Sequence, residues 1–391
     1  MFKRVKYYIF LRDVLILAIS AFGGPQAHFA MFLEMLVQKR GYLNEKELIE
    51  LHALCQILPG PTSTQTLTAI GFKIGGPGLA YLTLLVWATP AVLIMISAGV
   101  TISLLNEHNF SLEFTKYIQP MAVGIVAYSA LVIIKKVVNT KIAVVLMIIA
   151  AIISFYVRTP YVFPVLLIIG GVITAFGYKK QPIEDKDKIQ INWSNFILWG
   201  AVLVMAALLG GITNWLGIRL FENFYRNGSL IFGGGQVLVP LLYTEFVEFK
   251  NYLTSEEFLS GFALMQALPG PVFSFSAYVG AISMNAFGIP SQILGGLLAA
   301  LGIFLPGTFL IFFVIRFWEQ LKKFRVVKAS LDGINAVSSG MVLAATFLLF
   351  MPLKNDPMNY VLMLGTFLVL TFTRIPSPFI VATGLILGFL I

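Results

Sequence analysis

The feature that most constrains this chain is a run of 58 residues, 258–315, that contains no charged side chain. A helix needs about 20 apolar residues to cross a bilayer, so this run alone holds at least two crossings. The alternating segments of about ten residues that build membrane barrels are absent. The sequence therefore predicts an all-α integral membrane protein. Further uncharged runs of suitable length lie at 80–105, 117–134, 142–157, 159–178, 194–218, 357–373 and 375–391, and a run at 329–353 contains only Asp332.

The composition excludes most other classes of protein. Apolar residues make up 58% of the chain and charged residues 12%, too few for the surface of a cytosolic enzyme of this length. The net charge of +9 in so apolar a chain indicates basic cytoplasmic loops, and we expect no nucleic-acid partner. The one cysteine, Cys55, and the three scattered histidines have no metal-ligand spacing, so neither a metal nor a cofactor is expected. No ATP-binding loop or nucleophile–base pair is present, which favours a protein that is not an enzyme.

The chain contains an internal repeat. The segment Phe22-Gly23-Gly24-Pro25-Gln26 returns as Phe232-Gly233-Gly234-Gly235-Gln236, and the residues 53–61, ALCQILPGP, return at 263–271 as ALMQALPGP. Both matches have the same offset of 210 residues. The sequence therefore predicts two homologous units, at 1–178 and 219–391, joined at 179–218 by a charged linker and one additional transmembrane helix.

The charges of matching loops predict that the two units have opposite orientations. Residues 1–12 carry four basic residues and no acid, which places the N-terminus in the cytoplasm. The loop 106–116 has a net charge of −1, whereas the matching loop 316–328 has a net charge of +4. Inverted-topology repeats with broken or re-entrant helices near the bilayer midplane are a recurrent architecture of secondary transporters.

Two Pro-Gly-Pro segments, 59–61 and 269–271, lie inside apolar runs and predict broken helices, because proline lacks a backbone donor. A half-helix that starts after the first break would direct its N–H groups and hydroxyls at an anion. The second break is followed by more apolar residues, so the two halves are not expected to contribute equally to binding of the anion. Simple kinks are the alternative interpretation of each motif. The substrate-binding candidates at the four breaks are Gly23, Gly24, Gln26, His28, Gln56, Pro59, Gly60, Pro61, Thr62, Ser63, Thr64, Gln65, Gly233, Gly234, Gln236, Gln266, Pro269, Gly270, Pro271 and Ser274.

Charged residues near the breaks supply a second set of candidates. Glu34 and Glu245, at nearly matched positions, are candidates for carrying a coupling proton, and helix-end carboxylates are the alternative. Asp332 is expected to cap a helix, and Cys55 to pack in the interior. The basic residues that could attract an anion, or anchor the chain at the interface, are Lys39, Arg40, Lys73 and Lys250.

The four motifs together resemble the chromate ion transporter family in its long, two-domain form. The matching stretches are 22–28, 56–65, 232–241 and 266–271, so the resemblance covers both halves, although Tyr42-Leu43 stands where the family commonly has Trp-Leu. The resemblance implies a bacterial or archaeal inner-membrane carrier of chromate, with sulfate as the similar ion and efflux with chromate resistance as the role.

The sequence thus favours a secondary transporter of chromate or a related divalent oxyanion, embedded in the lipid bilayer and able to form a homodimer. Transport of sulfate or another anion is the main alternative, and a membrane-embedded enzyme or a non-transporting scaffold are weaker ones. Two negative charges are costly in a low-dielectric site, so we expect protons to move with the anion or in exchange for it.

Overall fold

The structure is a computed structural model that describes residues 2–390 apart from 23, 108–114, 178–191, 233, 234, 236, 318–323, 354 and 374. Within these residues the regular elements are helices, and no strand occurs, which confirms the all-α prediction. Five of the described helices contain segments long and apolar enough to cross a membrane, as expected for a multi-pass membrane protein. These segments are Thr62–Leu105, Ile118–Val137, Ser194–Thr213, Ile289–Val314 and Ala329–Phe350.

The elements follow the same order in the two parts of the chain. Each part has a first helix, a glycine-rich break, a short helix that widens into a π-helical turn, a capped helix, a Pro-Gly-Pro break, further helix and three final helices. The first part contains α1 (Phe2–Ser20), α2 (Gly24–Phe32), η1 (Leu33–Lys39), α3 (Glu45–Ile57), α4 (Thr62–Glu107), α5 (Ile118–Val137), α6 (Lys141–Tyr156) and α7 (Val162–Ala175). After α8 (Ser194–Thr213), the second part contains α9 (Leu216–Leu230), α10 (Leu238–Leu242), η4 (Tyr243–Phe249), α11 (Ser255–Gln266), η5 (Val272–Ser274), α12 (Phe275–Ser283), η6 (Asn285–Phe287), α13 (Ile289–Val314), α15 (Arg325–Phe350), α16 (Pro357–Phe372) and α17 (Ser377–Leu390).

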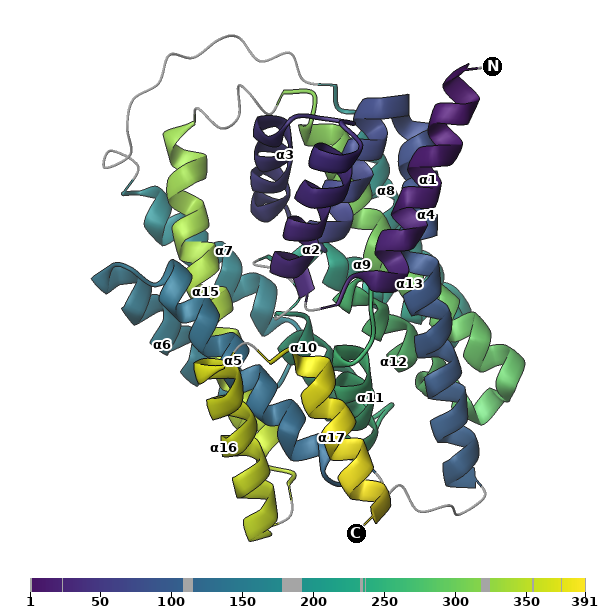
Figure 1. Ribbon diagram of the computed structural model, residues 1–391. Coiled ribbons are helices and arrows are strands. Elements are labelled where there is room, and N and C mark those ends of the chain that lie inside the picture. The colour runs from purple at the N-terminus through teal and green to yellow at the C-terminus, as the bar shows by residue number, and fades with distance from the viewer. Residues whose placement is uncertain are drawn as a thin grey trace.

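The two parts interleave instead of folding side by side (Figure 1). Helices α1, α4, α8, α9, α12 and α13 pack together into what we call the first body. The last three helices of each part form the second body, in which α5 packs against α16 and α17 while α15 packs against α6 and α7. Each body therefore contains helices from both parts of the chain.

Local sequence signals explain where the short helices begin. Asn44 caps α3, and its side chain and that of Glu47 form a capping box in which each accepts from the other's backbone N–H. Thr254 and Glu257 form the same box at the start of α11. Asp332 is not a helix cap as expected, because α15 begins at Arg325 and Asp332 lies inside it.

The outer surface is strongly apolar. Side chains such as Ile212, Ile168 and Phe372 are between 66% and 79% exposed on α8, α7 and α16. In water such a surface would favour aggregation, whereas in a bilayer it contacts lipid tails, which are also apolar. Helix α8, the additional helix between the two parts, packs on α9 and α13 and leaves most of its surface exposed.

Candidate functional site

Both Pro-Gly-Pro segments interrupt helices, as the sequence predicts. Helix α3 ends at Ile57 and α4 starts at Thr62, and between them Gly60 has a φ of +116°. Helix α11 ends at Gln266, and Gly270 has a φ of +103° before η5 begins. A side chain at either position would strain the backbone, so only glycine suits both breaks.

The two breaks are joined by reciprocal hydrogen bonds. The Gly60 N–H donates to the carbonyl oxygen of Ile231 at 2.8 Å, and the Gly270 N–H donates to that of Ala21, also at 2.8 Å. Each donor and each acceptor is related to its counterpart by the repeat offset of 210 residues. His28 Nε2 lies 3.1 Å from the same Ala21 oxygen and donates to it. Each Pro-Gly-Pro break is therefore bonded to the chain just before the other part's glycine-rich break, where its N–H finds a partner away from water.

Some predicted binding residues hold the first break in place. Gln65 Nε2 donates to the carbonyl oxygens of Pro59 at 2.8 Å and Gly307 at 3.2 Å. The Thr64 hydroxyl accepts from Trp87 Nε1 at 3.0 Å. These hydrogen bonds tie the start of α4 to its surroundings, whereas the buried Gln65 Oε1 has no hydrogen-bond partner among the described residues.

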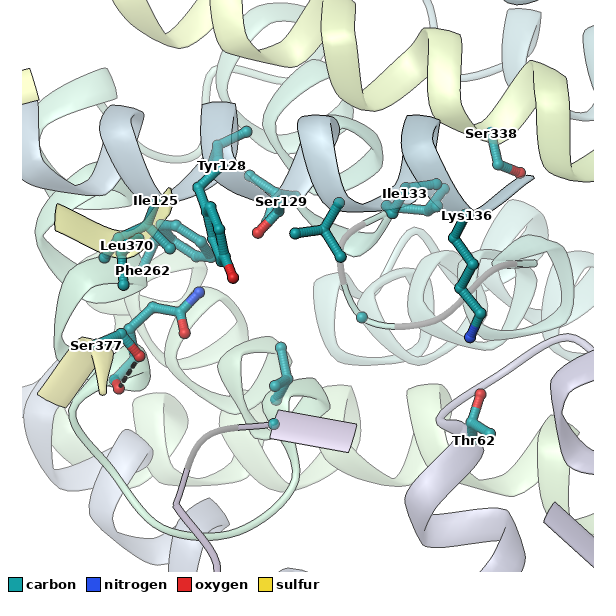
Figure 2. A pocket seen from close by; sticks show the side chains of 18 of the residues that line it. Thr62, Ile125, Tyr128, Ser129, Ile133, Lys136, Phe262, Ser338, Leu370 and Ser377 are labelled. Atoms are coloured by element: carbon teal, nitrogen blue, oxygen red, sulfur yellow. Dashed lines mark hydrogen bonds between the residues drawn. The ribbon is translucent and has the colours of Figure 1, made fainter. Parts of the chain in front are cut away.

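A cavity of about 440 Å³ lies between the second body and the broken helices. Among the predicted site residues, Gly24, Gln56, Thr62 and Gln266 line it. Helix α5 lines one side of it, with side chains pointing into the space (Figure 2). The remaining polar lining residues are His52, Tyr128, Ser129, Lys136, Asn335, Ser338, Thr373 and Ser377.

The described lining of the cavity carries one formal charge. Lys136 is its only Lys, Arg, Asp or Glu, and the ammonium group faces the Thr62 hydroxyl across the space (Figure 2). No hydrogen bond or ion pair to this ammonium is formed by the residues that the structure describes. Ser338 is 1% exposed, and its buried hydroxyl also lacks a described partner. A lining with a positive charge and with donor groups that have no described partner is suited to binding an anion.

The sequence does not single out Lys136 or Ser338. Lys136 follows the apolar run 117–134 and looks like a cation at the end of a spanning helix, where lysine commonly reaches the headgroups. Ser338 is one hydroxyl in an apolar helix. Only the packing of α5 and α15 beside the breaks brings both residues to the cavity.

His52 and Gln56, one turn apart on α3, form a hydrogen-bonded chain at the cavity. His52 Nδ1 lies 3.2 Å from Thr66 Oγ1, and Gln56 Nε2 lies 3.1 Å from His52 Nε2. The Thr66 hydroxyl donates to the Thr62 carbonyl oxygen at 2.8 Å. The chain thus connects the cavity to the first turn of α4.

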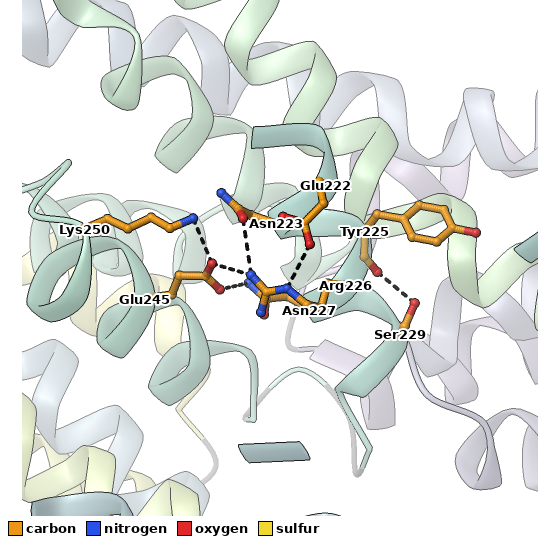
Figure 3. A network of polar contacts seen from close by, with 8 residues as sticks. All are labelled: Glu222, Asn223, Tyr225, Arg226, Asn227, Ser229, Glu245 and Lys250. Carbon is orange, nitrogen blue, oxygen red and sulfur yellow. Dashed lines mark hydrogen bonds and ion pairs between the residues drawn. The ribbon is translucent and has the colours of Figure 1, made fainter. Parts of the chain in front are cut away.

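The two predicted proton carriers have different surroundings. Glu245 is fully buried, and its carboxylate accepts from Arg226 at 2.7 Å, Lys250 at 3.0 Å and Asn227 at 2.8 Å (Figure 3). Glu34 is exposed and pairs with Lys39 at 2.6 Å, which lowers the pKa of Glu34. Neither side chain lines the cavity.

The four predicted anion-attracting cations are all paired with carboxylates. Besides the pairs of Lys39 and Lys250, Lys73 lies 2.5 Å from Glu47. Arg40 donates to Asp13 at 2.8 Å, and Tyr42 donates to the other oxygen of the same buried carboxylate. Asp13 is a residue that the sequence does not mark, because its partners lie far along the chain.

The remaining predicted residues fall into two groups. His28, Ser63 and Ser274 are buried outside the cavity lining, and Pro269 and Pro271 lie in the second break. Gly23, Gly233, Gly234 and Gln236 lie outside the described residues, as does the side chain of Gln26.

Sequence comparisons identify the family. The sequence profile of the chromate transporter family matches residues 9–176 and 218–389, which is most of the chain. The chain belongs to the chromate transporter family. This confirms the resemblance seen in the motifs, and because the family consists of transporters, the comparisons support transport as the class of function.

Three similar proteins each match almost the whole chain. An uncharacterised transporter of Methanocaldococcus jannaschii is 26% identical over 96% of this chain and 92% of its own length. A probable chromate transport protein of Synechococcus elongatus is 25% identical over 94% of this chain and 91% of its own length. A chromate transport protein of Cupriavidus metallidurans is 23% identical over 94% of this chain and 88% of its own length. No solved structure matches the chain.

Proposed function

We propose that this protein is a secondary transporter that moves chromate, or a similar divalent oxyanion, out of the cell across the inner membrane. The observation that carries the proposal is the cavity at the helix breaks, whose described lining holds Lys136 and no carboxylate. The names of the relatives from Synechococcus elongatus and Cupriavidus metallidurans support chromate as the cargo. Membership of the family supports transport as the class of function, and the single cation in the cavity lining supports a negatively charged cargo.

The proposed architecture is a pair of inverted repeats, 1–178 and 219–391, with the segment 179–218 as linker and inverting helix. The reciprocal bonds of Gly60 and Gly270 support a two-fold relation between the repeats, since such a relation produces every contact twice. The opposite charges of matching loops support the inversion and a cytoplasmic N-terminus. Broken helices would then meet near the bilayer midplane.

In the proposed transport cycle the anion enters the cavity and binds between Lys136 and the start of α4. Thr62, Gln56 and Ser338 donate hydrogen bonds to its oxygens. The cations predicted from sequence are neutralised by carboxylates, so we assign the attraction of the anion to Lys136. Movement of the second body relative to the first would open the cavity to each side in turn.

The test is uptake of labelled chromate and labelled sulfate into proteoliposomes, with and without an imposed pH gradient. We expect saturable uptake in which the two ions compete, and its loss when Lys136 is replaced by glutamine. Absence of uptake of both ions by folded, inserted wild-type protein would contradict the choice of cargo and leave the family assignment intact.

Proton coupling is part of the proposal, with Glu34 and Glu245 as the carriers indicated by sequence. The double substitution Glu34→Gln and Glu245→Gln should change the pH dependence of transport if either carboxylate carries the proton. Unchanged transport with unchanged pH dependence would exclude both residues from this role.

A further inference from the structure

The charges at the cavity do not balance for a divalent anion. Lys136 supplies one positive charge, and the described lining contains no other permanent charge. A dianion bound there keeps one uncompensated negative charge, which is costly away from water. Apart from Lys136, the titratable groups among the described lining residues are Tyr128 and His52, and only the imidazole can gain a positive charge by taking up a proton.

The hydrogen bonds of His52 show which ring nitrogen is free to accept a proton. Because the Thr66 hydroxyl donates its hydrogen to the Thr62 carbonyl oxygen, it accepts from His52 Nδ1, which therefore carries the ring proton. His52 Nε2 is then the acceptor of the Gln56 amide N–H at 3.1 Å. The basic nitrogen of the ring thus points to a cavity-lining side chain that can rotate.

The groups around His52 favour a neutral ring while the cavity is empty. Helix α2 presents the Phe29 ring, with 4.7 Å between ring centroids, α4 presents Thr66, and α5 contributes the cation Lys136. The η1 turn, which also packs on α3, contributes the exposed Glu34–Lys39 pair, whose charges cancel. Helix α3 is not one of the helices able to span a membrane, and burial together with Lys136 lowers the pKa of His52 to about 4.

We propose that His52 takes up one proton at Nε2 when a doubly charged oxyanion occupies the cavity beside Lys136. The proton comes from water, and the new N–H needs an acceptor. A half-turn of the Gln56 amide brings its Oε1 to Nε2 and leaves the NH₂ group free to donate elsewhere in the cavity. Two positive charges then face two negative ones, and the proton leaves with the anion or after it. This inference rests on the proposed transport of an oxyanion.

The sign of the pH dependence follows from this linkage. The bound anion favours the imidazolium, so lower pH must favour anion binding over the range in which the free ring is still neutral. The affinity should increase with each unit of decreasing pH, with a limit of tenfold per unit for one proton. A site without this uptake would show no such slope.

The experiment measures sulfate affinity of the purified full-length protein between about pH 5 and pH 8, the range in which histidine titrates. Sulfate keeps both charges over this range, so any slope reports on the protein. We expect a slope for the wild type and for Glu50→Gln, which removes a titratable group on the same helix outside the cavity lining. We expect His52→Gln, which can still donate to Thr66, to bind with an affinity that hardly varies with pH.

A second measurement does not depend on the folding of a variant. Addition of sulfate to weakly buffered wild-type protein near pH 6 should raise the pH, with an uptake of up to one proton per anion bound. If only chromate binds, the proton count is made with chromate after subtraction of the free anion's own titration. Anion binding without proton uptake, or a slope that persists in His52→Gln, would overturn the role of His52 and leave oxyanion transport standing. Failure of both anions to bind would overturn the proposed function itself.

Discussion

In the proposed function a single residue, Lys136, sets the sign of the charge of the ion that the cavity accepts. Its ammonium group lies at the end of α5 and faces Thr62, in a lining with little else to attract or repel charge. Low-dielectric walls strengthen the field of an isolated cation. The neighbouring Lys135 does not line the cavity, so the chain contains a matched control for this effect.

Replacement of Lys136 by glutamine should lower oxyanion uptake at least tenfold, because the attraction of a charge-assisted contact is lost. Lys136→Arg keeps the charge and should retain part of the uptake. Lys135→Gln should transport like the wild type. Initial rates in proteoliposomes measure the effect, and equal rates for Lys136→Gln and Lys135→Gln would show that Lys136 does not bind the ion.

Glu245 and Glu34 should differ in their contribution to stability. Glu245→Gln removes the only fully buried carboxylate of this network, so that Lys250 loses its carboxylate partner and Arg226 keeps only Glu222, which should destabilise the protein by about 3 kcal/mol. Glu34→Gln disrupts an exposed pair and should change stability little. Thermal unfolding in detergent compares the two variants, and equal midpoints would contradict a supporting role for the network in Figure 3.

At the scale of helices, the sequence predicts where elements end better than what they contact. The Pro-Gly-Pro breaks and the glycine-rich breaks are visible because proline and glycine act on the local backbone. The ion pair between the buried Asp13 and the exposed Arg40 is not visible, since the two residues are joined only when α1 packs against the turn after η1. The π-helical turns η1 and η4 at matched positions likewise leave no simple signal in the residue pattern.

The left-handed glycine in each break can be tested by adding one methyl group. A Cβ on Gly60 would lie 3.1 Å from Gln65 Nε2, and a Cβ on Gly270 would lie 3.0 Å from that of Ala91. With the strain of a positive φ, Gly60→Ala and Gly270→Ala should each cost about 1–3 kcal/mol. Gly200→Ala on α8 meets no atom within 4 Å and should cost nothing. Unfolding midpoints that do not separate these variants would contradict the strained geometry.

At the scale of the whole molecule, the repeat predicts two similar units but not how they combine. Apolar faces on α5 and α15 could be covered by any helix of the right pattern, including those of the same unit. The structure covers α5 with α16 and α17, and covers α15 with α6 and α7. The position of the cavity depends on how helices from the two parts of the chain pack together. The sequence alone therefore predicts the broken helices but does not predict that α5 lines the cavity.

Cutting the chain within 179–188 should therefore give two fragments that need each other. We expect neither fragment alone to transport, and co-expression of both to restore oxyanion uptake, because each body is built from both fragments. Co-purification through a tag on one fragment measures assembly. Transport by the first fragment alone, or failure of the fragments to associate while each stays folded, would contradict the interleaved packing.

The reciprocal bonds of Gly60 and Gly270 also affect how the chain must mature. While the ribosome is still making residues beyond 178, Gly60 has no Ile231 to bond and α5 has no α16 to cover it. The first helices therefore remain in the membrane as a partly folded intermediate, which is accessible to proteases and can form non-native contacts. Synthesis rate and membrane chaperones are thus expected to influence yield more than the stability of the finished molecule does.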